Sequence, residues 1–223
     1  MQFVDEGKIR DVINVAIVEL VEDKNTIIDF ISVLTDSMLY GHLLGVAKCS
    51  VQLGMSYGFS HKKLVSLAKA GLLHDIGKLF IDRDVLYRPC RLTDAEFEIV
   101  KTHPVLGYDH MKGKVKDKTI LEAIHHHHEK NNGKGYPDGL TKNSFVIEII
   151  TVADIYSALT EARVYKKAME VEKALSILEG DDGLNQAVVQ RLRDLVYDDV
   201  TVLLRARSFA KMYRKKYHIQ QAS

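Results

Sequence analysis

The residues best suited to chemistry lie in one short apolar stretch, where His74 and Asp75 are neighbours and Lys78 follows. If this stretch is helical, the first two side chains point about 100° apart, so an imidazole and a carboxylate can reach one metal site. The carboxylate has two oxygens and can bridge a second metal. Lys78 would lie on the same face and offer a positive charge to an anion held there. The alternative is a surface hydrogen bond between His74 and Asp75.

Other apolar helical patterns supply further imidazoles and carboxylates. An unpaired carboxylate within the apolar segment around Asp154 is costly to bury unless a cation accompanies it. A histidine such as His42 on an apolar face can also be an ordinary core residue. An imidazole and carboxylate set of this size exceeds the four ligands of structural zinc and favours two adjacent ions such as iron or manganese. The candidate ligands are His42, His74, Asp75, His103, His127, His128 and Asp154.

Helical periodicity predicts the elements that must position these groups. Thr93 and Glu96 form a capping-box signature, and Pro104 is expected to disfavour helix at His103, so that helix resumes at Val105. The segment 145–153 could be a strand, but no second strand-like run exists to pair with it, so we predict a helix. Helices are predicted at about 9–20, 27–34, 38–51, 64–72, 93–102, 105–111, 120–129, 145–153, 171–178 and 186–217.

The composition is that of an ordinary soluble chain, with 223 residues, 46% of them hydrophobic and 27% charged. The net charge of +1 favours neither a nucleic-acid polymer nor an anionic membrane, so phosphate binding must come from a local cluster. No basic and apolar leader and no membrane-length apolar run is present, so we expect a cytoplasmic location. Cys49 and Cys90 lack the spacing of a zinc knuckle and are expected to be reduced thiols.

From about His42 to Leu192, the sequence resembles the HD-GYP family of metal-dependent phosphohydrolases. A His-Asp pair alone is a weak signal, whereas the downstream run HHExxxGxGYP is highly specific. The residues that carry the resemblance are the His42 helix, His74-Asp75-Ile76-Gly77-Lys78, His103-Pro104, the run from His127 to Pro137, and Val152-Ala153-Asp154 with Ala158-Leu159-Thr160 and Arg163.

The resemblance implies an all-α fold, an HD-domain helical bundle with an N-terminal helical extension. Residues 1–30 would form a helical segment that packs on the main body or on a partner chain, and is too short for a recognisable sensor domain. Residues 31–223 would form the HD-GYP domain, including the C-terminal helix. The implied activity is hydrolysis of cyclic di-GMP to pGpG and/or GMP with two divalent ions, iron or manganese, held by the same seven ligands.

The resemblance also implies roles for other residues. Asp75 and Lys78 would be catalytic, and Lys78 would also stabilise charge on the substrate or help to protonate the leaving oxygen. Arg163 and Lys166 are three residues apart and would clamp phosphate. Tyr136, in the glycine-rich loop 131–139, would border the guanine pockets, or the loop would dock protein partners. Independently of the resemblance, the apolar stripe of the N-terminal helix would pack on the main body or provide a homodimer contact.

Some positions depart from the family pattern. Met38 replaces a glutamate that holds a third metal in some members, which favours two metals here. Ser157 and Val164 replace an aspartate and a proline beside the presumed substrate clamp. His125 and His126 are additional and are assigned to hydrogen bonding or solvent. Two alternatives therefore stay open: a catalytically weak cyclic-dinucleotide-binding signalling module, and an HD phosphohydrolase that acts on another nucleotide.

Overall fold

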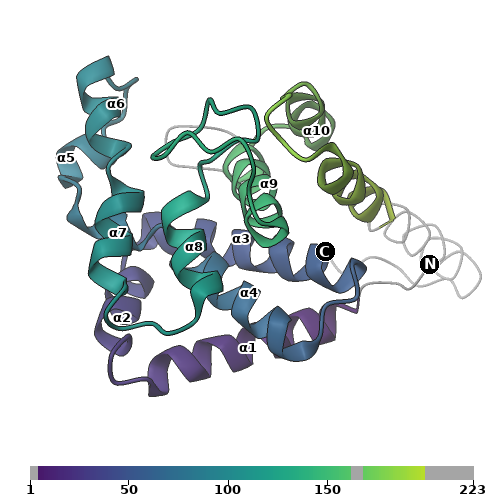
Figure 1. Ribbon diagram of the computed structural model, residues 1–223, viewed down its shortest axis with the longest axis horizontal. Helices are drawn as coiled ribbons and strands as arrows, with labels where there is room; N and C mark the ends of the chain where they lie inside the picture. Colours follow the sequence, from purple (N-terminus) through teal and green to yellow (C-terminus); the bar gives the residue numbers. More distant parts are fainter. Residues whose placement is uncertain (1–4, 162–167, 199–223) are drawn as a thin grey trace, which may run out of the picture.

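All regular elements in the described part of the chain are helices (Figure 1), which confirms the all-α prediction. The computed structural model describes residues 5–161 and 168–198, with only the backbone at 37 and 38. The predicted helix 186–217 is present from 186 to 198, and its remainder lies outside the described residues. The helices are α1 (Glu6–Glu22), α2 (Ile27–Thr35), α3 (Ser37–Ser56), α4 (His61–Leu73), the 3₁₀ helix η1 (Ile76–Phe80), α5 (Arg83–Leu86), α6 (Asp94–Val100), α7 (His103–Met111), α8 (Lys118–His126), α9 (Phe145–Thr160) and α10 (Val171–Glu179).

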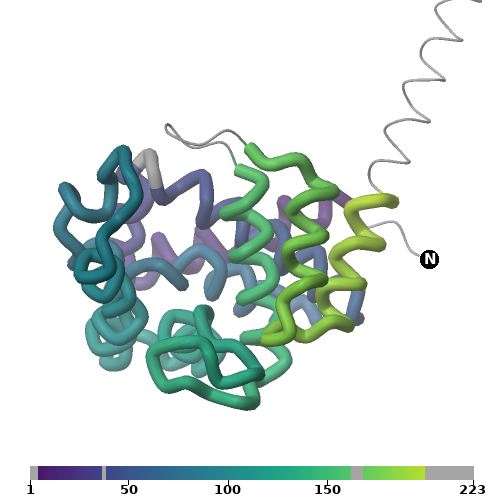
Figure 2. Tube along the Cα trace, turned by 90° about the horizontal axis from the view of Figure 1, so that it is seen from above, coloured from purple at the N-terminus to yellow at the C-terminus, as the bar shows by residue number. Residues whose placement is uncertain are grey.

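The core is organised around α4, which packs against α1, α3, α8 and α9. In Figure 1, α1, α3 and α4 lie across the lower part of the molecule, and α8 and α9 rise from them. A Cβ atom at Gly71 would lie 2.7 Å from the Cα atom of Ala47, so a glycine is needed where α4 crosses α3. In Figure 2, α9, α10 and the helical segment 186–198 lie side by side. Helices α3, α4 and α9, which carry or adjoin candidate site residues, also contact one another.

The apolar stripe of α1 is buried within this chain. Its members share one hydrophobic core with α3 and α4, so the stripe packs on the main body; they are Ile9, Val12, Ile13, Ala16 and Leu20. A homodimer contact through α1 stays a prediction. The division of the chain at residue 30 also stays a prediction.

The helix ends near the candidate site differ from the predicted ones. Helix α4 ends at Leu73, so His74 and Asp75 lie at the junction with η1 rather than within one continuous helix. Helix α7 begins at His103 and not at Val105. Pro104 lies in the first turn of α7, where backbone N–H groups make no hydrogen bond within the helix. The absence of an N–H at Pro104 therefore costs nothing there, and His103 can belong to the helix.

Among the described residues, no single helix is long and apolar enough to cross a membrane, although the bent pair Ile27–Thr35 and Leu39–Ser56 meets that test together by length and composition. The cytoplasmic location stays a prediction.

An ion cluster joins α2 to α7 and the loop that follows it. Asp29 lies 2.6 Å from Lys114 Nζ and 2.8 Å from His110 Nε2. Burial would raise the pKa of Asp29, but the hydrogen bonds from Lys114 and His110 outweigh it and lower the pKa below 3.8. Ionised Asp29 therefore stabilises the fold above its unfolded pKa, and this contribution is lost as the pH falls through the folded pKa.

In urea titrations, we expect Asp29→Asn to lower the free energy of unfolding by less than about 1 kcal/mol at neutral pH, and by still less in acid.

Candidate metal centre

The structure brings all seven candidate ligands into one cluster at the centre of the bundle. His42 comes from α3, and His74 and Asp75 come from the junction of α4 and η1. The cluster is completed by His103 at the start of α7, His127 and His128 after α8, and Asp154 on α9. Six of the seven are buried, and His128 is partly exposed. The convergence predicted from the sequence is therefore present, while the role of these residues as ligands remains a proposal.

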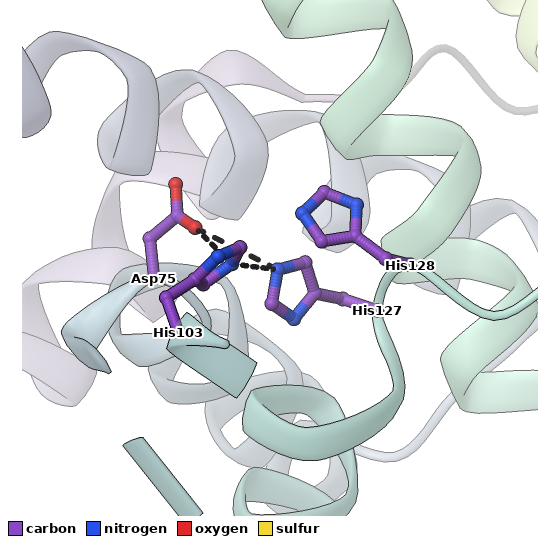
Figure 3. Close-up of side chains that lie close together, drawn as sticks. All are labelled: Asp75, His103, His127 and His128. Carbon is purple, nitrogen blue, oxygen red and sulfur yellow. Dashed lines mark hydrogen bonds and ion pairs between the residues drawn. The ribbon is translucent and has the colours of Figure 1, made fainter. Parts of the chain in front are cut away.

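The two oxygens of Asp75 face two different sets of imidazoles. Oδ1 lies 3.1 Å from His103 Nε2 and 3.6 Å from His127 Nε2. Oδ2 lies 3.3 Å from His74 Nε2 and 3.6 Å from His42 Nε2. Figure 3 shows the first set, in which Asp75 and the rings of His103, His127 and His128 gather around one space. Asp75 thus lies between two potential metal positions, as a bridging carboxylate must.

Asp154 completes the second set. Its Oδ1 lies 2.9 Å from His42 Nε2 and 3.7 Å from His74 Nε2, and its Oδ2 lies 3.7 Å from His128 Nδ1. Ligand atoms of Asp75, His103, His127 and His128 all lie within 4.8 Å of one another, and so do those of His42, His74 and Asp75. The described residues thus offer two adjacent groups that can each hold an ion.

Backbone carbonyls fix the orientation of three of the imidazoles. His74 Nδ1 lies 2.8 Å from the carbonyl oxygen of Gly71, and His103 Nδ1 lies 2.7 Å from that of Val100. His127 Nδ1 lies 2.8 Å from the Ala123 carbonyl oxygen. Because a carbonyl oxygen only accepts, each Nδ1 carries a proton and donates it, which directs the Nε2 atom of each ring into the cluster.

This arrangement leaves the centre of the cluster in need of a cation. His103 Nε2 and His127 Nε2 face each other at 3.1 Å, although in the neutral rings both atoms present lone pairs. His42 Nε2, His74 Nε2 and Asp75 Oδ1 are buried without a hydrogen-bond partner. Each unsatisfied buried polar atom costs about 1–3 kcal/mol, and divalent ions ligated by nitrogen and oxygen would satisfy all of them. The residues present therefore fit a dinuclear metal centre.

The pKa shifts agree with ligand roles. Burial would raise the pKa values of Asp75 and Asp154, but Lys78 and His74 hold the first well below its ordinary value, and the adjacent side chains of His42 and His74 do the same for the second. Burial lowers the pKa of His127 to about 4 and also lowers that of His128, so both rings are neutral at pH 7.

His74 behaves differently from these two rings. Burial would lower its pKa, but the adjacent negative charges of Asp75 and Asp154 outweigh it and raise the pKa to about 10. An ion that binds His74 must therefore displace a proton from it.

Lys78 lies beside the cluster. Its Nζ is 2.5 Å from Asp75 Oδ2, and its side chain is largely buried. In the structure its charge keeps Asp75 ionised. The proposed contribution of Lys78 to charge on the substrate remains a prediction.

Of the other residues predicted to contact substrate, only Tyr136 lies in the described part of the chain. Tyr136 lies at the edge of the cluster, with its ring centroid 4.6 Å from that of His128 and Lys101 Nζ 5.4 Å from its ring. Arg163 and Lys166 lie outside the described residues, as does Val164. Ser157 is buried, and its Oγ lies 2.6 Å from where a Cβ of Gly45 would be, so it packs α9 against α3.

Glu129 carries no role predicted from its sequence position, but in the structure its side chain anchors the loop segment 138–140. Its buried carboxylate accepts the backbone N–H groups of Asp138 at 2.6 Å, Gly139 at 3.0 Å and Leu140 at 2.9 Å. The available signal was its place directly after His127 and His128 in an apolar helical context, where an acidic residue needs partners.

Glu129→Gln is expected to loosen this loop. The amide that replaces one carboxylate oxygen would present N–H groups to backbone N–H groups, so we expect a loss of roughly 1.5–3 kcal/mol in the free energy of unfolding. Urea unfolding measures this loss, and hydrogen exchange should quicken at 138–140. The matched control is Glu122→Gln at an exposed position on α8. Equal exchange in the two variants would contradict the anchoring role.

Comparison with known proteins gives consistent matches. A family model described as HD domain matches residues 24–185. The cyclic di-GMP phosphodiesterase response regulator RpfG of Xanthomonas campestris is 37% identical over 130 residues, covering 56% of this chain and 34% of that protein. The 3′3′-cGAMP-specific phosphodiesterase 3 of Vibrio cholerae is 36% identical over 141 residues, covering 62% and 31%. The chain therefore spans about a third of the length of these relatives.

Solved structures share the fold. Bd1817, a HDG"Y"P protein from Bdellovibrio bacteriovorus, aligns with a TM-score of 0.62 and 20% identity over 85% of this chain and 62% of that one. The HD domain of the L. monocytogenes phosphodiesterase PgpH, in complex with cyclic-di-AMP, aligns with a TM-score of 0.57 and 15% identity over 78% and 97%.

Proposed function

The chain belongs to the HD domain family, and on this premise we propose that it is a metal-dependent phosphodiesterase that hydrolyses cyclic di-GMP to pGpG and/or GMP. The observation that carries the proposal is Asp75, whose two oxygens face two separate sets of imidazoles in a buried cluster. Relatives with 37% and 32% identity are named cyclic di-GMP phosphodiesterases, which supports this substrate class.

In this proposal, the cluster would hold two divalent ions, iron or manganese, and Asp75 would be a ligand of both. His42, His74 and Asp154 would hold one, and the other would be held by His103, His127 and His128. When bound, such ions supply Lewis acidity toward phosphate oxygens and lower the pKa of a water molecule. Imidazole and carboxylate ligands suit either metal.

The remaining roles belong to side chains around the cluster. Lys78 keeps Asp75 ionised and would offer positive charge toward the leaving oxygen. Tyr136, with Lys101 beside its ring, would border a guanine base. Arg163 and Lys166 would clamp phosphate, and the loop 131–139 would offer a surface to protein partners.

The test is an assay of the purified chain under reducing, anaerobic conditions with Mn²⁺ or Fe²⁺ added. We expect about two ions per chain and release of pGpG or GMP, followed by chromatography. A panel that also contains 3′3′-cGAMP and cyclic di-AMP addresses the second candidate, an HD phosphohydrolase for another nucleotide, which the Vibrio cholerae relative favours. Tight binding without product would overturn the proposal in favour of a signalling module.

A further inference from the structure

We propose an accessory metal site, formed by His125, His126 and Asp138, that binds one divalent transition-metal ion. The bound ion would fix the loop after α8 to the end of that helix. Zinc is the probe for this site. None of these three residues belongs to the seven candidate ligands of the central cluster. The inference therefore does not depend on the proposed function.

The three side chains have nearly the spacing that a bound ion requires. His126 Nε2 lies 3.0 Å from Asp138 Oδ2, and His125 Nδ1 lies 3.9 Å from the same oxygen. One ligand atom from each residue lies within 4.8 Å of the others. At ordinary zinc bond lengths of about 2.0–2.2 Å, tetrahedral ligands are roughly 3.3–3.6 Å apart. Small side-chain rotations are therefore enough to enclose an ion.

Two independent contacts hold the ligands in place. The ring of His125 stacks on Tyr108 of α7, with centroids 4.6 Å apart and planes 22° apart. On the loop side, the backbone N–H of Asp138 donates to the buried carboxylate of Glu129 at 2.6 Å. The histidines and the carboxylate are thus presented to one another by anchored segments, which is what a preorganised metal site needs.

The site is open to solvent, in contrast to the central cluster. The side chains of His125 and His126 are 19% and 23% exposed, and that of Asp138 is 47% exposed. An ion can therefore enter directly, and water can complete its coordination. Three protein ligands with an open position are a common zinc arrangement.

Occupancy would act on the loop that borders the central cluster. Asp138 follows Tyr136 by two residues, and the Tyr136 ring lies 4.6 Å from that of His128. An ion that joins Asp138 to His126 therefore restrains the segment that carries Tyr136. The alternative is that His126 and Asp138 form only their hydrogen bond at 3.0 Å, with no metal ion between them.

The test counts zinc bound to the full chain without a polyhistidine tag, by equilibrium dialysis over a range of free Zn²⁺. We expect wild type to bind one more zinc than Asp138→Asn, or to bind that zinc at least about tenfold more tightly. His126→Gln should show the same loss. The matched control is Asp109→Asn, which removes a nearby carboxylate that pairs with Lys112 at 2.7 Å and should bind zinc like wild type.

Hydrogen exchange at 138–140 gives a second readout. Zinc should slow exchange there in wild type and in Asp109→Asn, and should leave Asp138→Asn unchanged. Equal zinc binding in Asp138→Asn and wild type, or equal slowing of exchange, would overturn the accessory site. A chain that binds the additional zinc but hydrolyses no cyclic dinucleotide would overturn the proposed function alone.

Discussion

Asp75→Asn is expected to remove both the dinuclear metal content and the hydrolytic activity. Asn keeps the shape of Asp75 but has one oxygen instead of two and no charge. It therefore cannot offer one ligand oxygen on the side of His74 and a second on the side of His103. Removing one partner from a buried charge pair costs about 3–5 kcal/mol of folding stability. Separately, loss of the ions removes several kcal/mol of transition-state stabilisation, which corresponds to a fall in turnover of roughly 10²- to 10³-fold or more. The loss of charge also leaves Lys78 without its partner at 2.5 Å.

Two measurements check this result. Metal analysis of anaerobically purified Asp75→Asn should give fewer ions per chain than wild type, and chromatography should show little pGpG or GMP. The control is Asp84→Asn, at an exposed position on α5, which should retain metal and activity. Wild-type metal content in Asp75→Asn would exclude the bridging role, and a urea unfolding curve establishes that the variant is folded.

Much of the fold and of the cluster could be predicted from local features of the sequence. Apolar spacing predicted the helices because burial of one face is what stabilises them. The candidate ligands were identifiable because imidazoles and carboxylates are rarely left in apolar segments, as Asp154 on α9 illustrates. The segment 145–153 is β-branched, yet it forms part of α9 (Phe145–Thr160), and the described residues 5–161 and 168–198 contain no strand with which it could pair.

What the sequence could not supply depends on contacts between distant segments. Helix α4 ends at Leu73, and the 3₁₀ helix η1 that follows it packs against α7, which lies more than twenty residues further along the chain. The role of Glu129 depends on a loop that begins after it and returns to it at Asp138. Neither periodicity nor residue type contains this information, because both describe neighbours along the chain.

Gly77 shows how such a contact positions the site, and Gly77→Ala is the second variant with a large expected effect. A Cβ atom at Gly77 would lie 1.9 Å from the carbonyl oxygen of His103 and 2.7 Å from the backbone nitrogen of Gly107. Both neighbours are backbone atoms of α7, so neither can rotate away. Helices η1 and α7 must separate, which would move Asp75 and Lys78 away from His103.

The expected loss in the free energy of unfolding is about 3 kcal/mol or more, at the upper end for an overpacked core. A displacement of about 1 Å between reacting groups lowers turnover by roughly 10²-fold. Urea unfolding and product release measure the two effects. Gly113→Ala is the matched control, since a Cβ there meets nothing within 4 Å, and it should change the free energy of unfolding by less than about 0.5 kcal/mol. If Gly77→Ala were as stable and active as Gly113→Ala, the contact between η1 and α7 would not position Asp75.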